Sequence, residues 1–253
     1  MVFLPTVQEA LHRLYIAAPG ASLRKEDRKK AAELVGILSE IEHAVAAGKT
    51  DRPIHLVDAA AGKAYVGLLA AEFILAGRPR RSRVTLIERN AQRAAACRQA
   101  VAVVRAAQVD FTVAETEVAD AAAWPNEPDI VVALHACGPA ADAIAERAVA
   151  CRTRQLLLVP CCTSEAVAAV ALAMKRAEAL GLPRHAEVRR RFVQAIVDAE
   201  RTLCLEAAGY ETTVVPFVSP THTPHNLLWR ARRVGEPVRM AEAASRLQRL
   251  RAI

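Results

Sequence analysis

Short apolar runs alternate with longer amphipathic segments over most of the chain. Five such runs cover residues 54–59, 84–88, 109–114, 129–134 and 155–160. Runs that are apolar on both faces are typical of strands in a parallel sheet. The segments between them have helical length and spacing, and they lie near residues 63–77, 90–107, 139–150 and 163–180. The alternation predicts a parallel sheet covered by helices on both sides.

The last two apolar runs depart from this alternation. They cover residues 210–217 and 226–233, and the segment between them is too short for a crossover helix. We therefore expect them to pair as antiparallel strands at the end of the sheet. Another helix fits residues 187–208. The predicted fold is an α/β, Rossmann-like domain with a mostly parallel seven-stranded sheet and an antiparallel last strand.

Two helical segments precede the first strand. The shorter lies around Val7–Tyr15, and the longer extends from about Ser22 to Ala47, with Leu34, Leu38 and Ile41 at spacings of three and four. We predict three parts: an N-terminal helical extension (1–50), a central α/β domain (51–237) and a C-terminal helical tail (238–253).

Composition narrows the class of protein. Of the 253 residues, 53% are hydrophobic and 24% are charged, which excludes a disordered, collagen-like or coiled-coil chain. Since no apolar stretch reaches about 18 residues and no signal peptide is recognisable, we expect a cytoplasmic protein without membrane contact. We expect its six cysteines to be free thiols. The net charge of +7 permits an acidic partner such as RNA.

The loop after the first strand carries candidate cofactor chemistry. Asp58 closes the strand in the sequence VDAAAGKAY, and Gly62 precedes the next helix. A glycine lets the backbone approach a ligand, and a helix start presents free N–H groups. Glu88 ends the second strand, where a carboxylate can accept hydrogen bonds from the ribose hydroxyls of an adenosine.

These residues resemble the class I S-adenosylmethionine-dependent methyltransferases. That family has an acidic residue, a GxGxG loop and a second acidic residue at the next strand end; here Ala60 and Ala64 replace the outer glycines. The resemblance implies S-adenosylmethionine as cofactor, with Glu115 or Glu117 near the adenine. It assigns cofactor contacts to Asp58, Ala60, Gly62, Lys63, Glu88, Glu115 and Leu134. The alternatives for this loop are a nicotinamide-dependent dehydrogenase, although GxGxxG is absent, and a tight turn without ligand.

Cysteine and histidine gather where the fourth and fifth strands end. LHACG places His135 and Cys137 after one strand, and VPCC places Cys161 and Cys162 after its neighbour. His135 could act as a general base, or a thiolate of Cys137 or Cys161 could add to a pyrimidine. A zinc site is disfavoured because Cys161 and Cys162 are adjacent and no CxxC occurs, so we predict no metal. A purely structural role remains the fourth alternative.

The motifs LHACG, VPCC, AGYET and TPHN together resemble a methyltransferase branch that includes tRNA 2′-O-methyltransferases. The resemblance implies a methyltransferase that acts on RNA, either tRNA or rRNA. The candidate substrate-binding residues are Arg189, Arg190, His225 and Asn226. A catalytically degenerate domain that binds RNA or protein is the first alternative, and an NAD(P)-dependent oxidoreductase is the second.

Overall fold

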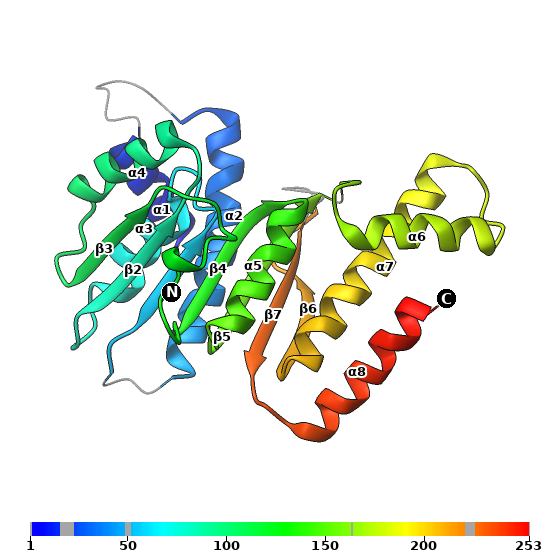
Figure 1. Ribbon diagram of the computed structural model, residues 1–253. Helices are drawn as coiled ribbons and strands as arrows, with labels where there is room; N and C mark the ends of the chain where they lie inside the picture. The colour runs from blue at the N-terminus through cyan, green and yellow to red at the C-terminus, as the bar shows by residue number, and fades with distance from the viewer. Residues whose placement is uncertain (1, 16–22, 49–51, 163, 221–225, 253) are drawn as a thin grey trace.

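A single seven-stranded sheet organises the chain (Figure 1). The computed structural model describes residues 2–15, 23–48, 52–162, 164–220 and 226–252. The strands stand in the order β3-β2-β1-β4-β5-β7-β6. Their bounds are β1 (His55–Ala59), β2 (Ser82–Ile87), β3 (Val109–Ala114), β4 (Ile130–Cys137), β5 (Gln155–Cys162), β6 (Tyr210–Pro216) and β7 (Leu227–Arg233). The predicted strands and their alternation with helices are confirmed.

Strand β7 runs in the direction opposite to that of the other described strands. It pairs antiparallel with β5 on one side and with β6 on the other, whereas β1, β2, β3, β4 and β5 are joined by parallel pairings. The predicted mostly parallel sheet with an antiparallel last strand is therefore confirmed. The parallel strands all end at one edge, which is where the loops after β1, β2 and β4 meet.

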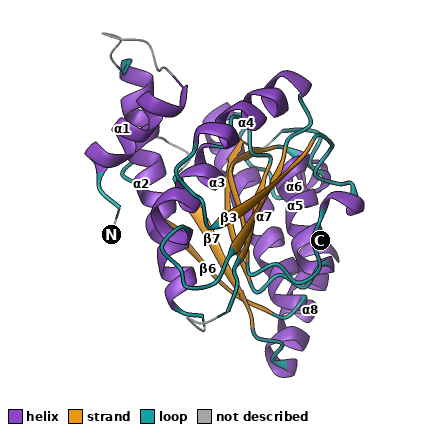
Figure 2. Cartoon of the chain, turned by 90° about the vertical axis from the view of Figure 1, so that its left-hand side faces the viewer, coloured by secondary structure: helices purple, strands orange, loops and turns teal. Residues whose placement is uncertain are grey.

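Alternate residues of each strand face two separate cores. Leu56, Leu86 and Val132 pack with the helices at the N-terminal end of the chain, and Val57 and Ala133 pack with α5 and α7. This is the two-residue period of strands buried on both faces. Figure 2 shows α1 and α2 on one side of the strands and α5 on the other.

The described part of the chain contains eight α-helices. They are α1 (Leu4–Tyr15), α2 (Lys25–Ala46), α3 (Tyr65–Ala70), α4 (Ala91–Val103), α5 (Pro139–Ala150), α6 (Ala168–Ala179), α7 (Ala186–Ala207) and α8 (Pro237–Ala252). A π-helical turn (Ala71–Leu75) continues α3, and a short 3₁₀ turn covers Ala121–Ala123. The predicted helix start at Ser22 lies outside the described residues. None of the described helices is long and apolar enough to cross a membrane.

Helix α2 is part of the main core. Leu34, Ile37, Leu38 and Ile41 are fully buried and belong to the same cluster as Leu56 of β1. Glu40 forms an ion pair with Arg230 of β7. The segment predicted as an N-terminal extension therefore covers one face of the sheet.

Helices α6 and α7 form a projection with its own small core. Val167, Val170, Ala173, Val193 and Val197 cluster apart from the two sheet cores. We call residues 167–197 the α6–α7 arm. Figure 1 shows that it extends beyond the sheet.

One turn of α3 lies so close to the sheet that it requires glycine. A Cβ atom at Gly67 would lie 2.5 Å from Cδ2 of Leu86 and 3.2 Å from Cβ of Asp58. Both neighbours are buried. We expect Gly67→Ala to lower the free energy of unfolding by about 1 kcal/mol, because overpacking outweighs the better helix propensity of alanine.

The matched control is Gly77→Ala, where a Cβ atom would meet nothing within 4 Å. That change should leave stability equal or slightly higher. Urea denaturation of the two variants tests the close approach, and equal midpoints would contradict it.

Candidate active site

A cavity of about 480 Å³ opens at the carboxyl edge of the sheet. Its lining residues come from the ends of β1, β2 and β4, the loop after β3 and the first turns of α4 and α5. The residues around it are Ala60, Glu88, Arg89, Arg93, Glu117, Val118, Ala119, His135, Cys137, Pro139, Ala140 and Ala143. Ala60, Glu88, His135 and Cys137, all predicted from the sequence, thus meet in one cavity.

The loop after β1 has the backbone of a glycine loop. Ala60, Gly62 and Ala64 all have a positive φ, of 59°, 62° and 61°. These are the three positions aligned with the family glycines. The conformation is therefore present although two of the residues are alanines, which adopt it at a steric cost.

Glu88 ties this loop to β2. Its two carboxylate oxygens accept hydrogen bonds from the backbone N–H groups of Gly62 and Asn90, both at 2.8 Å. The side chain is buried, yet it lines the cavity. A carboxylate offers about four acceptor positions, so the same group can still accept from hydroxyls of a ligand.

Asp58 lies beneath the loop and does not line the cavity. It is buried, and its Oδ2 accepts a hydrogen bond of 2.8 Å from the Gly67 N–H. Burial raises the pKa of Asp58 to about 7, although the Gly67 hydrogen bond and Lys30 act to lower it.

The other predicted cofactor residues lie away from the cavity lining. Lys63 is exposed, and its carbonyl oxygen accepts a 2.6 Å hydrogen bond from Tyr15. Leu134 packs against the core, and Glu115 pairs with Arg98 on α4. Of the two acids considered near the adenine, Glu117 is the one at the cavity.

His135 sits in a bulge of β4. The register with β5 shifts across it, between Leu134 and Ala136, and again between Ala136 and Cys137; its φ is 63°. The strand therefore continues to Cys137 rather than ending near Leu134 as predicted. A non-glycine residue in this conformation is strained, and such residues concentrate at functional sites.

The imidazole ring of His135 contacts α2, which packs on the face of the sheet opposite α5. Its Nε2 lies 2.9 Å from Oε2 of Glu33, which also receives a 3.1 Å hydrogen bond from Nζ of Lys30. Sequence reasoning missed both residues. The available signal was two charged residues one turn ahead of Leu34 and Ile37, on the apolar side of the predicted helix.

Among the cysteines whose side chains the structure describes, one differs from the prediction. Cys97, Cys151 and Cys204 are free thiols, as expected, but Cys137 is disulfide-bonded. In the backbone register Cys137 pairs with Cys162, so two strand ends that carry cysteines lie side by side. A sulfur in a disulfide is not a nucleophilic thiolate, so the expectation of a free thiol at Cys137 is wrong.

The other predicted cysteine chemistry receives no support from the described residues. The side chains of Cys161 and Cys162 lie outside the described part of the chain. Within that part, no group of three or more histidine, cysteine or acidic residues is arranged to hold a metal ion.

The predicted substrate residues lie in two places. Arg189 donates to the carbonyl oxygens of Leu182 and Pro183, and Arg190 pairs with Glu187 within the α6–α7 arm. Asn226 donates to the carbonyl oxygen of Val218 between β6 and β7. His225 lies outside the described residues.

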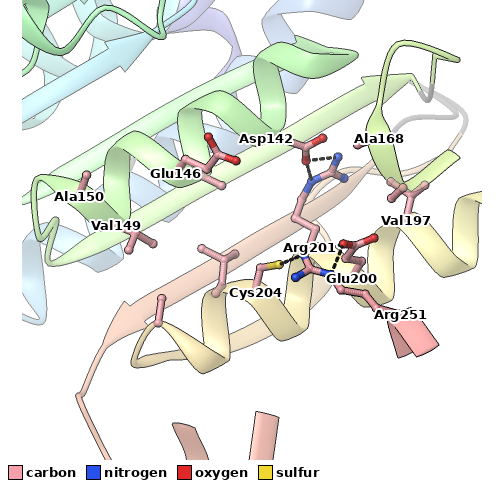
Figure 3. Close-up of a pocket in the computed structure, with 14 residues that line it drawn as sticks. Asp142, Glu146, Val149, Ala150, Ala168, Val197, Glu200, Arg201, Cys204 and Arg251 are labelled. Atoms are coloured by element: carbon pink, nitrogen blue, oxygen red, sulfur yellow. Dashed lines mark hydrogen bonds and ion pairs between the residues drawn. The ribbon is translucent and has the colours of Figure 1, made fainter. Parts of the chain in front are cut away.

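A second cavity, of about 400 Å³, lies between α5 and α7 (Figure 3). Its charged groups largely satisfy one another: Arg201 pairs with Asp142, and Arg251 pairs with Glu200. None of the residues predicted for the site lines it. We therefore assign the chemistry to the cavity at the sheet edge.

The strained alanine at the cavity gives a stability prediction. We expect Ala60→Gly to raise the free energy of unfolding by about 0.5–1 kcal/mol, because relief of positive φ exceeds the added freedom of the unfolded chain. Ala95→Gly, at an exposed position inside α4, is the control and should lower it by about 1 kcal/mol. Thermal unfolding of both variants tests whether the two changes in the free energy of unfolding have opposite signs.

Asp58 gives a prediction about pH. Because its native pKa of about 7 exceeds the ordinary value of 3.8, its stabilising contribution is complete below pH 3.8 and is lost as the pH rises through 7. Asp58→Asn keeps an acceptor for the Gly67 N–H but cannot titrate. The urea midpoint should therefore fall more between pH 5 and pH 7.5 in the wild type than in the variant. An equal fall in both proteins would refute the prediction.

Comparison with known proteins agrees with this geometry. A family model described as a methyltransferase domain matches residues 29–169, which is more than half of the chain. The magnesium protoporphyrin IX methyltransferase of Synechocystis PCC 6803, solved with bound S-adenosylmethionine, is similar in fold. Its TM-score is 0.50 at 13% identity, and the match covers 89% of this chain and 90% of that one.

The CurJ carbon methyltransferase is similar at a TM-score of 0.51 and 10% identity, over 92% of this chain and 58% of that one. No match was found among curated proteins. The two structural likenesses establish a Rossmann-like methyltransferase fold. From the family match, which begins in α2 and ends in α6, the chain belongs to the methyltransferase-domain family.

Proposed function

We propose that this protein transfers the methyl group of S-adenosylmethionine to RNA, either tRNA or rRNA. The observation that carries the cofactor assignment is the cavity at the sheet edge, where a loop with three positive φ values meets Glu88. The resemblance of the LHACG and VPCC motifs to those of tRNA 2′-O-methyltransferases supports RNA as the acceptor.

The residues around the cavity fit the cofactor. A Cβ atom built at Gly62 meets nothing within 4 Å, so the backbone there is open to a ligand. Glu88 would accept hydrogen bonds from the ribose hydroxyls, and Val118 and Ala140 offer apolar surface to the adenine. S-adenosylmethionine supplies an electrophilic methyl group when bound.

The chain's own contribution is positioning. The loop and Glu88 would hold the donor at one side of the cavity, and His135 stands at the end of β4. When the acceptor is held in line with the methyl carbon at near-attack distance, most of the rate enhancement of methyl transfer comes from orientation.

The α6–α7 arm supports a polyanionic acceptor. Between Met174 and Arg191 there are six basic and two acidic side chains. Lys175, Arg184 and Arg191 are exposed. The arm follows directly after β5, whose end lies at the same sheet edge as the cavity. We propose that these side chains contact RNA phosphates, a role for which Arg189 is less suited because it caps the turn within the arm.

Calorimetric titration tests the cofactor assignment. We expect S-adenosylmethionine and S-adenosylhomocysteine to bind, and NADH not to bind. Glu88→Gln should weaken binding at least about tenfold because one hydroxyl acceptor is lost. Glu115→Gln is the matched control, since Glu115 stands at the next strand end but pairs with Arg98, and its affinity should be unchanged. Absence of binding by the wild type would indicate the degenerate alternative.

Transfer of a radiolabelled methyl group to unfractionated tRNA and rRNA tests the acceptor. We expect Arg184→Glu/Arg191→Glu to reduce RNA binding and its salt dependence without changing cofactor affinity. Arg80→Glu/Arg83→Glu carries the same charge change at the start of β2, at the opposite end of the strands, and serves as control. Equal loss in both variants would contradict a role of the arm.

A further inference from the structure

We propose that Glu33 of α2 is a positioning residue for His135, and that the methyl acceptor is an atom that must lose a proton, a hydroxyl oxygen or an N–H nitrogen. This inference rests on the proposed methyl transfer and adds the chemical class of the acceptor atom.

The first observation is the pairing itself. Nε2 of His135 lies 2.9 Å from Oε2 of Glu33, within ordinary hydrogen-bond distance. The two residues are 102 positions apart in the chain and come from α2 and β4. Glu33 is 7% exposed, so its carboxylate is shielded from water and directed at the ring.

The second observation is the charge state of Glu33. Burial acts to raise the pKa of Glu33, but the hydrogen bond with His135 and the charge of Lys30 outweigh burial, and the net pKa is lowered. Lys30 lies 3.1 Å from the same oxygen. Glu33 is therefore a carboxylate at neutral pH, able to orient an imidazole and to stabilise an imidazolium.

The third observation is the strain at His135. The ring reaches Glu33 from a bulge with φ of 63°, a conformation that glycine or asparagine adopts more easily. A residue that only filled space would not require the bulge. His135 also lines the cavity, so the residue whose ring pairs with Glu33 of α2 stands at the candidate site.

The proposal gives the acceptor's proton a path through the ring of His135. With Nε2–H donated to Glu33, Nδ1 is the ring nitrogen that accepts a proton. The lone pair of the acceptor oxygen or nitrogen forms a bond to the methyl carbon, the carbon–sulfur bond breaks, and its electron pair returns to sulfur. The acceptor's proton passes to Nδ1, and Glu33 stabilises the resulting imidazolium before the proton leaves to solvent.

An acceptor without a proton would not use this arrangement. A tertiary ring nitrogen or a thiolate already has a reactive lone pair and needs no base. The Lys30–Glu33–His135 series therefore favours a ribose hydroxyl or a base N–H among the atoms of RNA.

Nuclear magnetic resonance of the histidine rings tests the positioning role without any acceptor. Long-range ¹H–¹⁵N spectra, assigned with His135→Gln and recorded at a pH where histidine rings are neutral, should show the proton of the His135 ring on Nε2. In Glu33→Ala the ring should become a mixture of tautomers, whereas Glu33→Gln keeps an acceptor and should retain Nε2–H. Glu40→Gln on the same helix, which removes only the carboxylate paired with Arg230, should match the wild type. A wild-type tautomer in Glu33→Ala would overturn the proposal.

Methyl transfer to the RNA pool tests the acceptor class. We expect kcat to fall at least about tenfold in Glu33→Ala and less in Glu33→Gln, with the KM for S-adenosylmethionine unchanged. An unchanged kcat, or a methyl group found on a tertiary nitrogen or sulfur, would overturn the proposal. If the wild type methylates no RNA, the proposed function fails, while the ring spectra still judge the pairing of Glu33 with His135.

Discussion

Burial of both sheet faces is the constraint on which the rest of this structure depends. Strands that are apolar on both faces must be covered by helices on both faces. The N-terminal helices cover one face, and α5 and α7 cover the other. Because α2 must bury Leu34 and Ile37 against the sheet, it also delivers Glu33 to the end of β4. The packing of α2 against the sheet therefore both completes the core and positions Glu33 at the candidate site.

Local pattern was sufficient to predict the strands, the helices and the loop that approaches a cofactor. Consecutive apolar residues and the position of Gly62 are visible over a few neighbours in the sequence. The contact between Glu33 and His135 was not predictable because it joins positions 102 residues apart and depends on how α2 crosses the sheet. The bulge at His135 and the disulfide at Cys137 depend likewise on the register of β4 with β5.

The loop after β1 shows that a backbone conformation can persist when the residue type changes. Its three alternate positions keep a positive φ although two are alanine, since Glu88 and the carbonyl of Ile87 hold the loop from β2 through the N–H groups of Gly62 and Ala61. A motif search that requires glycine would miss this loop. The physical requirement is a backbone shape, and hydrogen bonds from a neighbouring strand can maintain it.

The separate core of the α6–α7 arm has a consequence for motion. Val170, Ala173, Val193 and Val197 contact one another rather than the sheet cores, so few apolar contacts couple the arm to the rest of the fold. Such a unit opens with a smaller free energy than global unfolding. Its amide protons should therefore exchange earlier than those of β1 and β4. The fold thus joins a sheet edge anchored between two cores to an arm that can open without disturbing them.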